Sequence, residues 1–476
     1  MNINISADTH RQTPVEQSGI THTLSKFVSN LRPENIPEET RRILHAAVID
    51  AIGCGLYGLT TEPCAIVSSY AADQGGPSEA SYWAGGGGRG SITNVALAAC
   101  TAVHGFDFDD HSRAKIHPGA AIIPSALALA EREGSSGKAF MTAIAAGYEV
   151  MNRISLAADP SVSRMRGWHL TGTIGTFGVA AAASSLLGFD TDTTASALGL
   201  AGTQSSGLWA FTADGAMSKR LHPGLAGRSG LMAAELAARG FHGPRKILEA
   251  EDGGFLAATS DQIHPNEISD GLGEVWRTDK TCFKPYACCG SNHAAIDALL
   301  SLKAENDLAP EMIDRITVGV SKVVERQTGF AYSRSSVLNA QMSIRYNLAV
   351  AMLDGNALVE QFTPERIAEA GVNELAGKVD VVVDADMDAV YPRLYAGIVT
   401  LTLKDGQRLT RRIDHSKGMP EAPMSLDEIR MKFLSLASAA IGDLDAETLL
   451  TDIAKTFELD NVGTLGKRLG ALLLQD

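Results

Sequence analysis

One stretch of sequence decides how this chain divides into domains: Ile398-Val-Thr-Leu-Thr-Leu403, continued by Lys404-Asp-Gly-Gln407 and Arg408-Leu-Thr-Arg-Arg-Ile413. Its first and last segments have the composition of β-strands, and the Asp-Gly between them strongly indicates a β-hairpin. Two earlier segments, Ile316–Val320 and Val379–Val383, are also rich in β-branched residues. We therefore predict a small sheet in this part of the chain, with helices between its strands.

The sequence on both sides of this region predicts helices. From Thr21 to Leu272, and again after Gly418-Met-Pro, Ala- and Leu-rich segments have few β-branched runs, and several begin at Ser, Thr, Asn or Pro and end near Gly. Many of their outward positions are Ala, Ser or Gly, so we expect these helices to pack inside a large bundle or against a second subunit. The longest predicted helices are Glu38–Gly58, Asn94–His104, Pro124–Glu133, Gly137–Leu156, Gly172–Leu187, Thr191–Gly202, Ser229–Arg239, His293–Glu305, Met342–Leu353 and Ser425–Ala440.

These patterns predict a mostly α fold, with a large all-helical domain built from both termini and a smaller α+β lid domain. The predicted bounds are 19–274 for the first part of the helical domain, 275–416 for the lid domain and 417–476 for the C-terminal part of the helical domain. A chain of 476 residues is too long for one ordinary core, which agrees with this division. Residues 1–18 are polar, and we expect them to be disordered.

Composition narrows the classes of function. The 41 basic and 55 acidic residues give a net charge of −14, which argues against a nucleic acid or an anionic membrane as a partner. The N-terminus lacks a basic region followed by an apolar core, and apolar runs such as Phe177–Leu187 are too short to span a bilayer. Six cysteines in so long a chain do not form a disulfide framework of the secreted kind. We therefore expect a cytoplasmic protein.

The most unusual polar segment is His104-Gly-Phe-Asp107-Phe-Asp109-Asp110-His111, followed by Lys115-Ile-His117-Pro-Gly119. Three carboxylates, three imidazoles and an ammonium fall within fourteen positions, which is costly inside a fold unless the groups pair, bind a ligand or move protons. We expect the Pro-Gly after His117 to end any local helix. Asp109, His111 and His117 could instead bind a metal, and capping of the preceding helix is the structural alternative.

Further segments place cations and imidazoles beside Gly or Pro. Arg166-Gly-Trp168-His169 leads into an Ala-rich helix whose N-terminus would favour an anion. Ser218-Lys219-Arg220-Leu-His222-Pro-Gly224 offers two cations beside a histidine, although such a segment is ordinarily a solvated turn. Phe283-Lys284-Pro-Tyr286-Ala-Cys288-Cys289-Gly290 lies at the predicted domain boundary, where ligand clefts commonly form. Ser343-Ile-Arg345-Tyr346 lies on a predicted helix and could face the same cleft or solvent.

The spacing of two other motifs argues against a bound cofactor. Gly85-Gly-Gly-Gly88-Arg-Gly lacks a following Lys-Ser/Thr, so we interpret it as a surface turn rather than a phosphate-binding loop. Cys282, Cys288 and Cys289 lack the usual spacing of an iron–sulfur site of the aconitase kind, and we expect them to be small buried thiols. We therefore expect neither a cofactor nor a metal.

Taken together and in this order, these segments resemble the MmgE/PrpD family of cofactor-independent lyases and isomerases, which includes 2-methylcitrate dehydratase, cis-aconitate decarboxylase and iminodisuccinate epimerase. The resemblance spans nearly the whole chain. It implies a helical domain with an α+β lid, usually as a homodimer, and a small polycarboxylate substrate. The matching elements are Asp107-Phe-Asp-Asp…His117, Gly167-Trp-His169, Lys219-Arg220…His222, Lys284-Pro-Tyr-Ala-Cys-Cys and Gln341-Met-Ser-Ile-Arg-Tyr346.

By position, the resemblance implies a catalytic set of an acid, two histidines, two lysines and a tyrosine, namely Asp107, His117, His169, Lys219, Lys284 and Tyr346. The expected substrate-binding neighbours are Arg220, His222, His111 and Cys289. Cys289 stands where the motif of the family's animal decarboxylase carries a histidine five positions after the lysine. The proton-transfer role of that histidine therefore does not transfer to this chain.

The reactions of this family create or quench negative charge on a carbon next to a carboxylate, and fixed cations would stabilise that charge. The candidate cations that would hold the substrate carboxylates are Lys219, Lys284 and Arg220. We expect His117 and His169 to titrate near neutrality and to act as general acid and base. We therefore expect a lyase that dehydrates or decarboxylates a small di- or tricarboxylate. The alternatives are an epimerase of a dicarboxylate such as iminodisuccinate, a catalytically silent carboxylate-binding protein, and a metal-dependent hydrolase.

Overall fold

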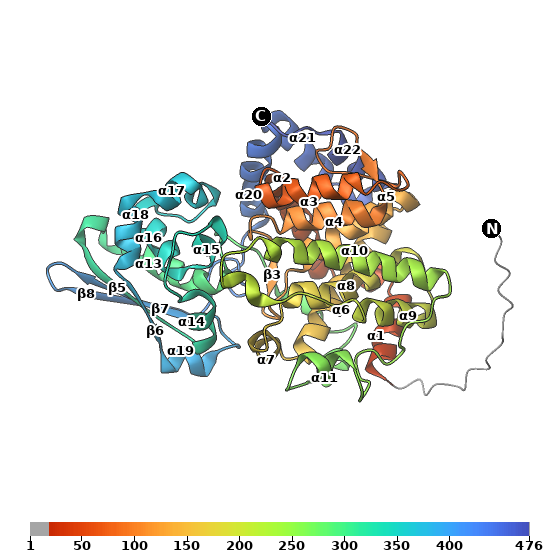
Figure 1. Ribbon diagram of the computed structural model, residues 1–476, viewed down its shortest axis with the longest axis horizontal. Helices are drawn as coiled ribbons and strands as arrows, with labels where there is room; N and C mark the ends of the chain where they lie inside the picture. The colour runs from red at the N-terminus through yellow and green to blue at the C-terminus, as the bar shows by residue number, and fades with distance from the viewer. Residues whose placement is uncertain (1–18, 476) are drawn as a thin grey trace.

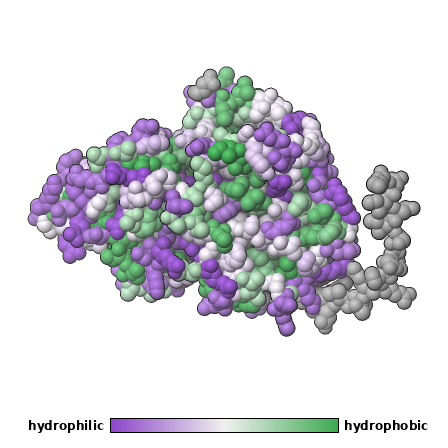
Figure 2. Space-filling model, in the orientation of Figure 1, coloured by the Kyte–Doolittle hydropathy of each residue, from purple (hydrophilic) through white to green (hydrophobic). Residues whose placement is uncertain are grey.

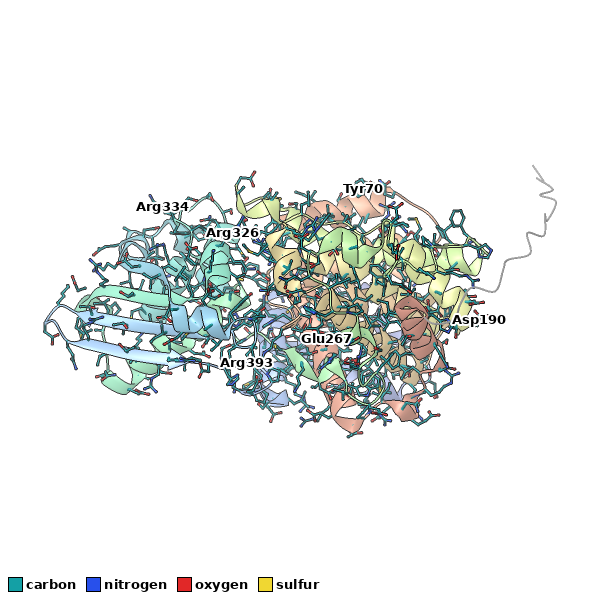
Figure 3. The ribbon with its side chains drawn as sticks, turned by 90° about the horizontal axis from the view of Figure 1, so that it is seen from below. Tyr70, Asp190, Glu267, Arg326, Arg334 and Arg393 are labelled. Carbon is teal, nitrogen blue, oxygen red and sulfur yellow. The ribbon has the colours of Figure 1, made fainter. Side chains whose placement is uncertain are left out.

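The computed structural model describes residues 19–475, and the expectation of disorder for residues 1–18 lies outside that range. Two parts lie side by side: a large helical part that contains the first and last helices, and a smaller part in which helices flank a sheet (Figure 1). The mostly helical class predicted from the sequence is confirmed. Charged side chains project from the outside of both parts, for example Arg334 and Arg393 from the α+β part and Asp190 from the helical part (Figure 3).

The helical part is built around α8 (Leu170–Leu186), which is buried without interruption from Leu170 to Ser184. Because its apolar and small residues occur all round the helix, it needs neighbours on every side. Glycines permit the close approach: a Cβ atom at Gly147 would lie 2.8 Å from the carbonyl oxygen of Gly178. The helices that pack against α8 are α5 (Pro118–Glu133), α6 (Gly137–Ala157), α9 (Thr191–Gly202) and α10 (Ser218–Ala238).

The C-terminal segment returns to this helical part. Helix α20 (Leu426–Ile441) packs against α2 (Glu38–Leu59), and α22 (Gly463–Ala471) packs against α5. By length and composition α2 could cross a membrane, but 72% of its most apolar 18-residue window is buried inside the protein. The apolar surface of α2 is therefore explained by its place in the core.

The α+β part contains a four-stranded sheet with the strand order β6-β5-β7-β8. Strand β5 (Ile313–Val320) is parallel to β6 (Val379–Val383) and antiparallel to β7 (Gly397–Leu403), which forms the predicted hairpin with β8 (Arg408–Ile413). Buried and half-buried residues alternate along β7, as its sequence predicts. The helices that contact the sheet include α13 (His293–Asn306) and α16 (Ile344–Asp354).

A short antiparallel pair joins the two parts. Strand β3 (His111–Ser112) pairs with β4 (Thr281–Cys282), so that His111 lies opposite Cys282. This pairing brings the polar segment 104–119 next to the entry into the α+β part, just before Lys284. The two segments are far apart in sequence, and only the fold brings them together.

Two prolines do not act as the sequence analysis expects. Pro118 begins α5 instead of ending a helix, because proline has a suitable φ for the first helical position and lacks only an N–H that would have no partner there. Helix α10 begins at Ser218 and continues through Pro223, so the segment 218–224, for which a solvated turn was the structural alternative, is the start of a long buried helix. Pro223 removes only the helical hydrogen bond to the carbonyl group four residues earlier.

The remaining elements complete the two parts. Helix α4 packs against α10 and against α5, and it leads directly into the polar segment. The bounds of these elements are α1 (Ile20–Asn30), α3 (Glu62–Asp73), β1 (Ala80–Ser81), β2 (Arg89–Gly90), α4 (Ile92–Val103), α7 (Pro160–Met165), α11 (Phe255–Thr259), α12 (Asn266–Ser269), α14 (Lys322–Thr328), α15 (Val337–Met342), α17 (Pro364–Ala368), α18 (Ala370–Gly377), α19 (Ala385–Val390) and α21 (Asp443–Ile453).

Candidate active site

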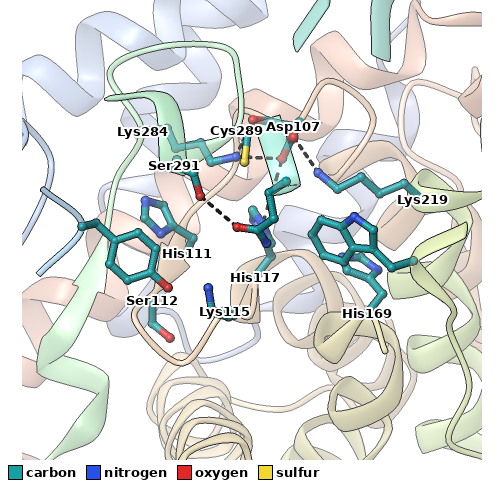
Figure 4. Close-up of a pocket in the computed structure, with 14 residues that line it drawn as sticks. Asp107, His111, Ser112, Lys115, His117, His169, Lys219, Lys284, Cys289 and Ser291 are labelled. Atoms are coloured by element: carbon teal, nitrogen blue, oxygen red, sulfur yellow. Dashed lines mark hydrogen bonds and ion pairs between the residues drawn. The ribbon is translucent and has the colours of Figure 1, made fainter. Parts of the chain in front are cut away.

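A pocket lies where the helical part meets the α+β part (Figure 4). Most of the residues predicted for the site line it, namely Asp107, His111, His117, His169, Lys219, Lys284 and Cys289. The lining also includes residues outside the predicted set, namely Ser112, Lys115, Trp209, Gly290, Ser291, Gln327 and Tyr395.

Three long helices begin at this pocket. His117 is the residue before α5, His169 is the residue before α8, and Lys219 lies in the first turn of α10. The N–H groups of a first helical turn lack partners within the helix and carry partial positive charge. At α5 the first turn offers little, because Pro118 has no N–H and the N–H of Gly119 donates to Oδ1 of Asp110, so the starts of α8 and α10 are the helix ends that would favour an anion.

Asp107 is buried and holds both lysines of the site (Figure 4). Its Oδ2 accepts a hydrogen bond from Nζ of Lys219 at 2.5 Å, and its Oδ1 accepts one from Nζ of Lys284 at 2.7 Å. Burial by itself would raise the pKa of Asp107, but the charges of the two lysines outweigh burial and hold this pKa well below its usual range. Asp107 is therefore an anion that fixes the position of two cations.

The two lysines differ in how firmly they hold a proton. Burial lowers the pKa of Lys219 in spite of the opposing charge of Asp107. Burial also acts against the charged form of Lys284, but the charges of Asp107 and Asp109 outweigh it and raise the pKa of this lysine. Lys284 is therefore a permanent cation, and Lys219 is the lysine that gives up a proton more readily.

His104 and His117 share the carboxylate of Asp109. Nδ1 of His104 lies 3.0 Å from this carboxylate, and Nδ1 of His117 lies 3.2 Å from its Oδ2. Nε2 of His117 lies 4.0 Å from Oδ1 of Asp107. Burial lowers the pKa of His104 to about 3 despite the charge of Asp109, so His104 is neutral. Nδ1 of His117 therefore faces Asp109 at ion-pair distance without a hydrogen bond among the described residues, and Nε2 lies on the side of Asp107.

His169 is held by a second histidine. Its Nδ1 lies 2.8 Å from Nδ1 of His222, and in such a contact one ring donates while the other, which is neutral, accepts. Burial lowers the pKa of His222 to about 4, and burial together with the charges of His222 and His104 lowers the pKa of His169 well below its usual value. The expectation that His169 titrates near neutrality is therefore wrong. Its Nε2 is the ring nitrogen that remains for a ligand.

Three residues of the predicted set lie outside the pocket lining, namely Tyr346, Arg220 and His222, of which His222 contacts the pocket residue His169. Tyr346 is buried within the α+β part, where its hydroxyl donates to the carbonyl oxygen of Gln361. Its helix directs this ring into the core of its own domain, and the tyrosine that lines the pocket is Tyr395, just before β7. Arg220 donates to Oε1 of Gln341 at 2.6 Å and so links the helical part to the α+β part.

The polar cluster could also be considered as a metal site. Ligand atoms of His104, Asp107, Asp109 and His117 lie within 4.8 Å of one another. However, both oxygens of Asp107 already accept hydrogen bonds from ammonium groups, and a divalent cation would lie beside these positive charges. This set of residues therefore fits an anionic ligand better than a metal ion.

A buried network supports the loop that carries Asp107 and Asp109. Nζ of Lys432, on α20, donates to Oδ1 of Asp50 at 2.7 Å and to the carbonyl oxygen of Phe108 at 2.5 Å. The C-terminal segment therefore helps to position the site although it does not line the pocket. Sequence reasoning missed Lys432, because its partners are remote in the chain.

All six cysteines are free. Cys282 and Cys288 are buried, as expected for small thiols in a core, and Cys289 lines the pocket. Burial raises the pKa of Cys288, which makes this thiol a poor nucleophile.

The fold and the pocket together define a two-part, mostly helical protein with a pocket rich in lysine and histidine between its parts. The sequence profile of the MmgE/PrpD N-terminal domain matches residues 22–267, and that of the MmgE/PrpD C-terminal domain matches residues 286–455. The chain belongs to the MmgE/PrpD family, which confirms the resemblance of its motifs.

Relatives in this family match along nearly the whole chain. The chain is 30% identical to the cis-aconitate decarboxylase-like protein oryM of Aspergillus oryzae, over 91% of this chain and 93% of the relative. It is 28% identical to the cis-aconitate decarboxylase of Aspergillus terreus, over 94% of this chain and 96% of the relative. It is also 28% identical to the cis-aconitate decarboxylase of Homo sapiens, over 94% and 93% of the two chains.

Proposed function

We propose that this protein is a cofactor-independent lyase that acts on a small di- or tricarboxylate, by dehydration or by decarboxylation. The observation that carries this proposal is the gathering of Lys219, Lys284, His117 and His169 in one pocket at the N-termini of three helices. Full-length similarity to proteins named cis-aconitate decarboxylases supports it.

The two lysines suit the binding of a carboxylate next to the reacting carbon. In a decarboxylation the bond to the departing carboxylate breaks, carbon dioxide leaves, and the electron pair remains until a proton is added. In a dehydration a base removes a proton from carbon, and an acid protonates the departing hydroxyl group. Both routes place negative charge beside the remaining carboxylate, and the fixed ammonium groups of Lys219 and Lys284 would stabilise that charge.

His117 is the proposed proton carrier. Its Nδ1 lies 3.2 Å from Oδ2 of Asp109, and its Nε2 lies 4.0 Å from Oδ1 of Asp107, the carboxylate that holds both lysines. A positioned general acid or base commonly contributes roughly 10²- to 10⁴-fold in rate. His169, whose pKa is lowered by burial, is a candidate for a hydrogen bond to the substrate through Nε2, because His222 occupies its Nδ1.

The reaction can be tested directly. The purified protein is incubated in deuterated water with cis-aconitate, 2-methylcitrate or iminodisuccinate, and products are followed by proton and carbon NMR. We expect loss of carbon dioxide or of water from one tricarboxylate. Binding without any conversion or proton exchange would contradict the proposal and would favour a silent carboxylate-binding protein.

An epimerase acting on a dicarboxylate such as iminodisuccinate is the second candidate. The observation that favours it is that His117 and His169, at the starts of two different helices, both line the pocket and could serve one carbon as base and acid. The same NMR experiment separates the two candidates, since an epimerase exchanges a carbon-bound hydrogen for deuterium without losing any other group.

We also propose that the protein is a homodimer. Ile66 and Tyr70 on α3 are 55% and 51% exposed, and Met232 on the neighbouring α10 is 41% exposed. Apolar surface gathers over this region in Figure 2. Light scattering should give about twice the 50.1 kDa mass of one chain, and a monomer would contradict this proposal. The cytoplasmic location stays a prediction.

A further inference from the structure

Lys115 differs from the other cations of the pocket in its surroundings. It lies in the loop between β3 and α5, lines the pocket, and has a φ of 57°, in the left-handed region that a lysine seldom adopts. Backbone strain of this kind persists where the surrounding structure enforces it, commonly at functional sites. Asp107 has the same φ of 57° in the same polar segment.

The side chain of Lys115 contacts two tyrosines of the α+β part. Its Nζ donates to the hydroxyl of Tyr391 and lies 4.7 Å from the ring centroid of Tyr391 and 5.0 Å from that of Tyr395. Within residues 19–475 no carboxylate lies at ion-pair distance from Lys115, whereas both other lysines of the pocket are paired with Asp107. Lys115 therefore offers a positive charge that the described protein does not neutralise.

Two donors among the lining residues also lack acceptors. The hydroxyl of Tyr395 and the indole N–H of Trp209 are buried, and neither has a hydrogen-bond partner among the described residues. Buried donors without a partner are rare in folded proteins and indicate a missing ligand or water. An anionic oxygen group would satisfy them.

A buried guanidinium lies beside Trp209, behind the pocket lining. Arg164 is 7% exposed, its guanidinium carbon lies 3.7 Å from the ring centroid of Trp209, and it has no ion pair within the described part of the chain. Asp107 is the acidic residue of the lining, and its charge is already taken by two lysines. The part of the lining that holds Lys115 and Tyr395 therefore carries an unpaired positive charge and a donor without an acceptor among the described residues.

From these contacts we propose that Lys115, with the hydroxyl of Tyr395, binds a second carboxylate of the substrate, distal to the one held by Lys219 and Lys284. The inference rests on the proposed function and makes it more specific: the pocket selects molecules with two or more carboxylates and discriminates against monocarboxylates. Lys115 is then a specificity-determining residue, and its contact with the α+β part couples ligand binding to the junction between the two parts.

The test compares the binding of propane-1,2,3-tricarboxylate and butyrate, two unreactive probes, to the full-length protein by NMR titration. We expect Lys115→Met to weaken tricarboxylate binding roughly 10- to 100-fold, as for the loss of one hydrogen bond to a charged group, and to change butyrate binding by less than about twofold. Lys115→Arg should restore most of the affinity. Lys138→Met, which removes an exposed lysine, is the matched control for charge.

A second variant pair tests the tyrosine. Tyr395→Phe should weaken tricarboxylate binding, whereas Tyr346→Phe, which removes a hydroxyl outside the pocket, should not. Unchanged tricarboxylate affinity in Lys115→Met, or an equal loss for both probes, would overturn the distal subsite while leaving the proposed function intact. Failure of the wild-type protein to bind either probe would overturn the proposed function and the subsite together.

Discussion

Oδ2 of Asp109 lies 3.2 Å from Nδ1 of His117, while Nε2 of the same ring lies 4.0 Å from Asp107. His117 therefore lies between a carboxylate at ion-pair distance and a carboxylate that is paired with two lysines. This arrangement separates the support of the proposed proton carrier from the binding of the substrate. Each function can be removed by a different substitution.

Asp109→Asn should slow turnover more than it weakens binding. The amide can still accept a hydrogen bond, but it cannot stabilise an imidazolium, so we expect kcat to fall by roughly 10²- to 10⁴-fold with a small change in KM. The pH dependence of kcat should shift as well. Steady-state kinetics test this, with the exposed Asp314→Asn as the control. A larger effect on KM than on kcat would count against this role of Asp109.

Lys219→Met should mainly weaken the binding of polycarboxylates. It removes one of the two cations paired with Asp107 and leaves Lys284 as the other partner of this carboxylate. The free energy of unfolding should therefore also decrease, by less than the roughly 3–5 kcal/mol typical of a broken buried pair. Calorimetric titration and urea unfolding measure the two effects, with the exposed Lys467→Met as the control.

The double variant Lys219→Met/Asp107→Asn tests the shared carboxylate. It also takes the charged partner away from the buried Lys284, so it should recover neither stability nor affinity. An unchanged affinity for polycarboxylates in Lys219→Met would contradict the role of Lys219 in holding a substrate carboxylate.

Stability should decrease as the pH falls below about 6.5. Burial lowers the pKa of His104 and of His293 to about 3 and that of His222 to about 4. At a pH between these values and about 6.5, the unfolded chain therefore binds protons at these histidines and the folded protein does not. Each such histidine contributes at most about 1.4 kcal/mol per pH unit. Burial and the charges of Asp50 and Asp109 raise the pKa of Asp110, which acts in the opposite direction.

A difference between variants isolates the contribution of one histidine. Urea unfolding at pH about 7 and about 5 should show a smaller loss of stability for His293→Asn than for the wild-type protein. The exposed His242→Asn serves as the matched control and should retain the wild-type loss. Equal losses in all three proteins would contradict the neutral, buried state of His293.

Chelators should not affect activity. The ligand atoms of His104, Asp107, Asp109 and His117 are close enough to bind one metal ion. However, both carboxylate oxygens of Asp107 already accept hydrogen bonds from ammonium groups. Turnover is measured after treatment with EDTA and after addition of Zn²⁺ or Mg²⁺, alongside elemental analysis of the protein. Activity that is lost on chelation and restored by one metal would overturn the cofactor-free account.

The sheet was predictable because its signals are local. The Asp-Gly hairpin and the β-branched runs specify β5 to β8 without reference to the rest of the chain. The start of α10 was not predictable from the sequence, because Pro223-Gly224 indicates a break in the helix. Only the packing of α10 against α4 and α8 explains why the helix continues there. Tertiary contacts override local propensity at such positions.

The residues of the site were also predictable only where the signal is local in sequence. Asp107, His117, His169, Lys219 and Lys284 belong to motifs that the sequence displays, and the fold brings them into one pocket. The positions of Tyr395 and Tyr346 depend on which way each segment of the α+β part faces, and no spacing within either segment contains that information. The pKa of His169 depends likewise on its contact with His222, which lies on another helix.

The most direct test of the central claim is the effect of His117→Ala on turnover of the substrate identified by NMR. If His117 carries the proton, the rate should fall by roughly 10²-fold or more, while circular dichroism and the binding of propane-1,2,3-tricarboxylate remain close to those of the wild-type protein. A rate near that of the wild-type protein would contradict the account.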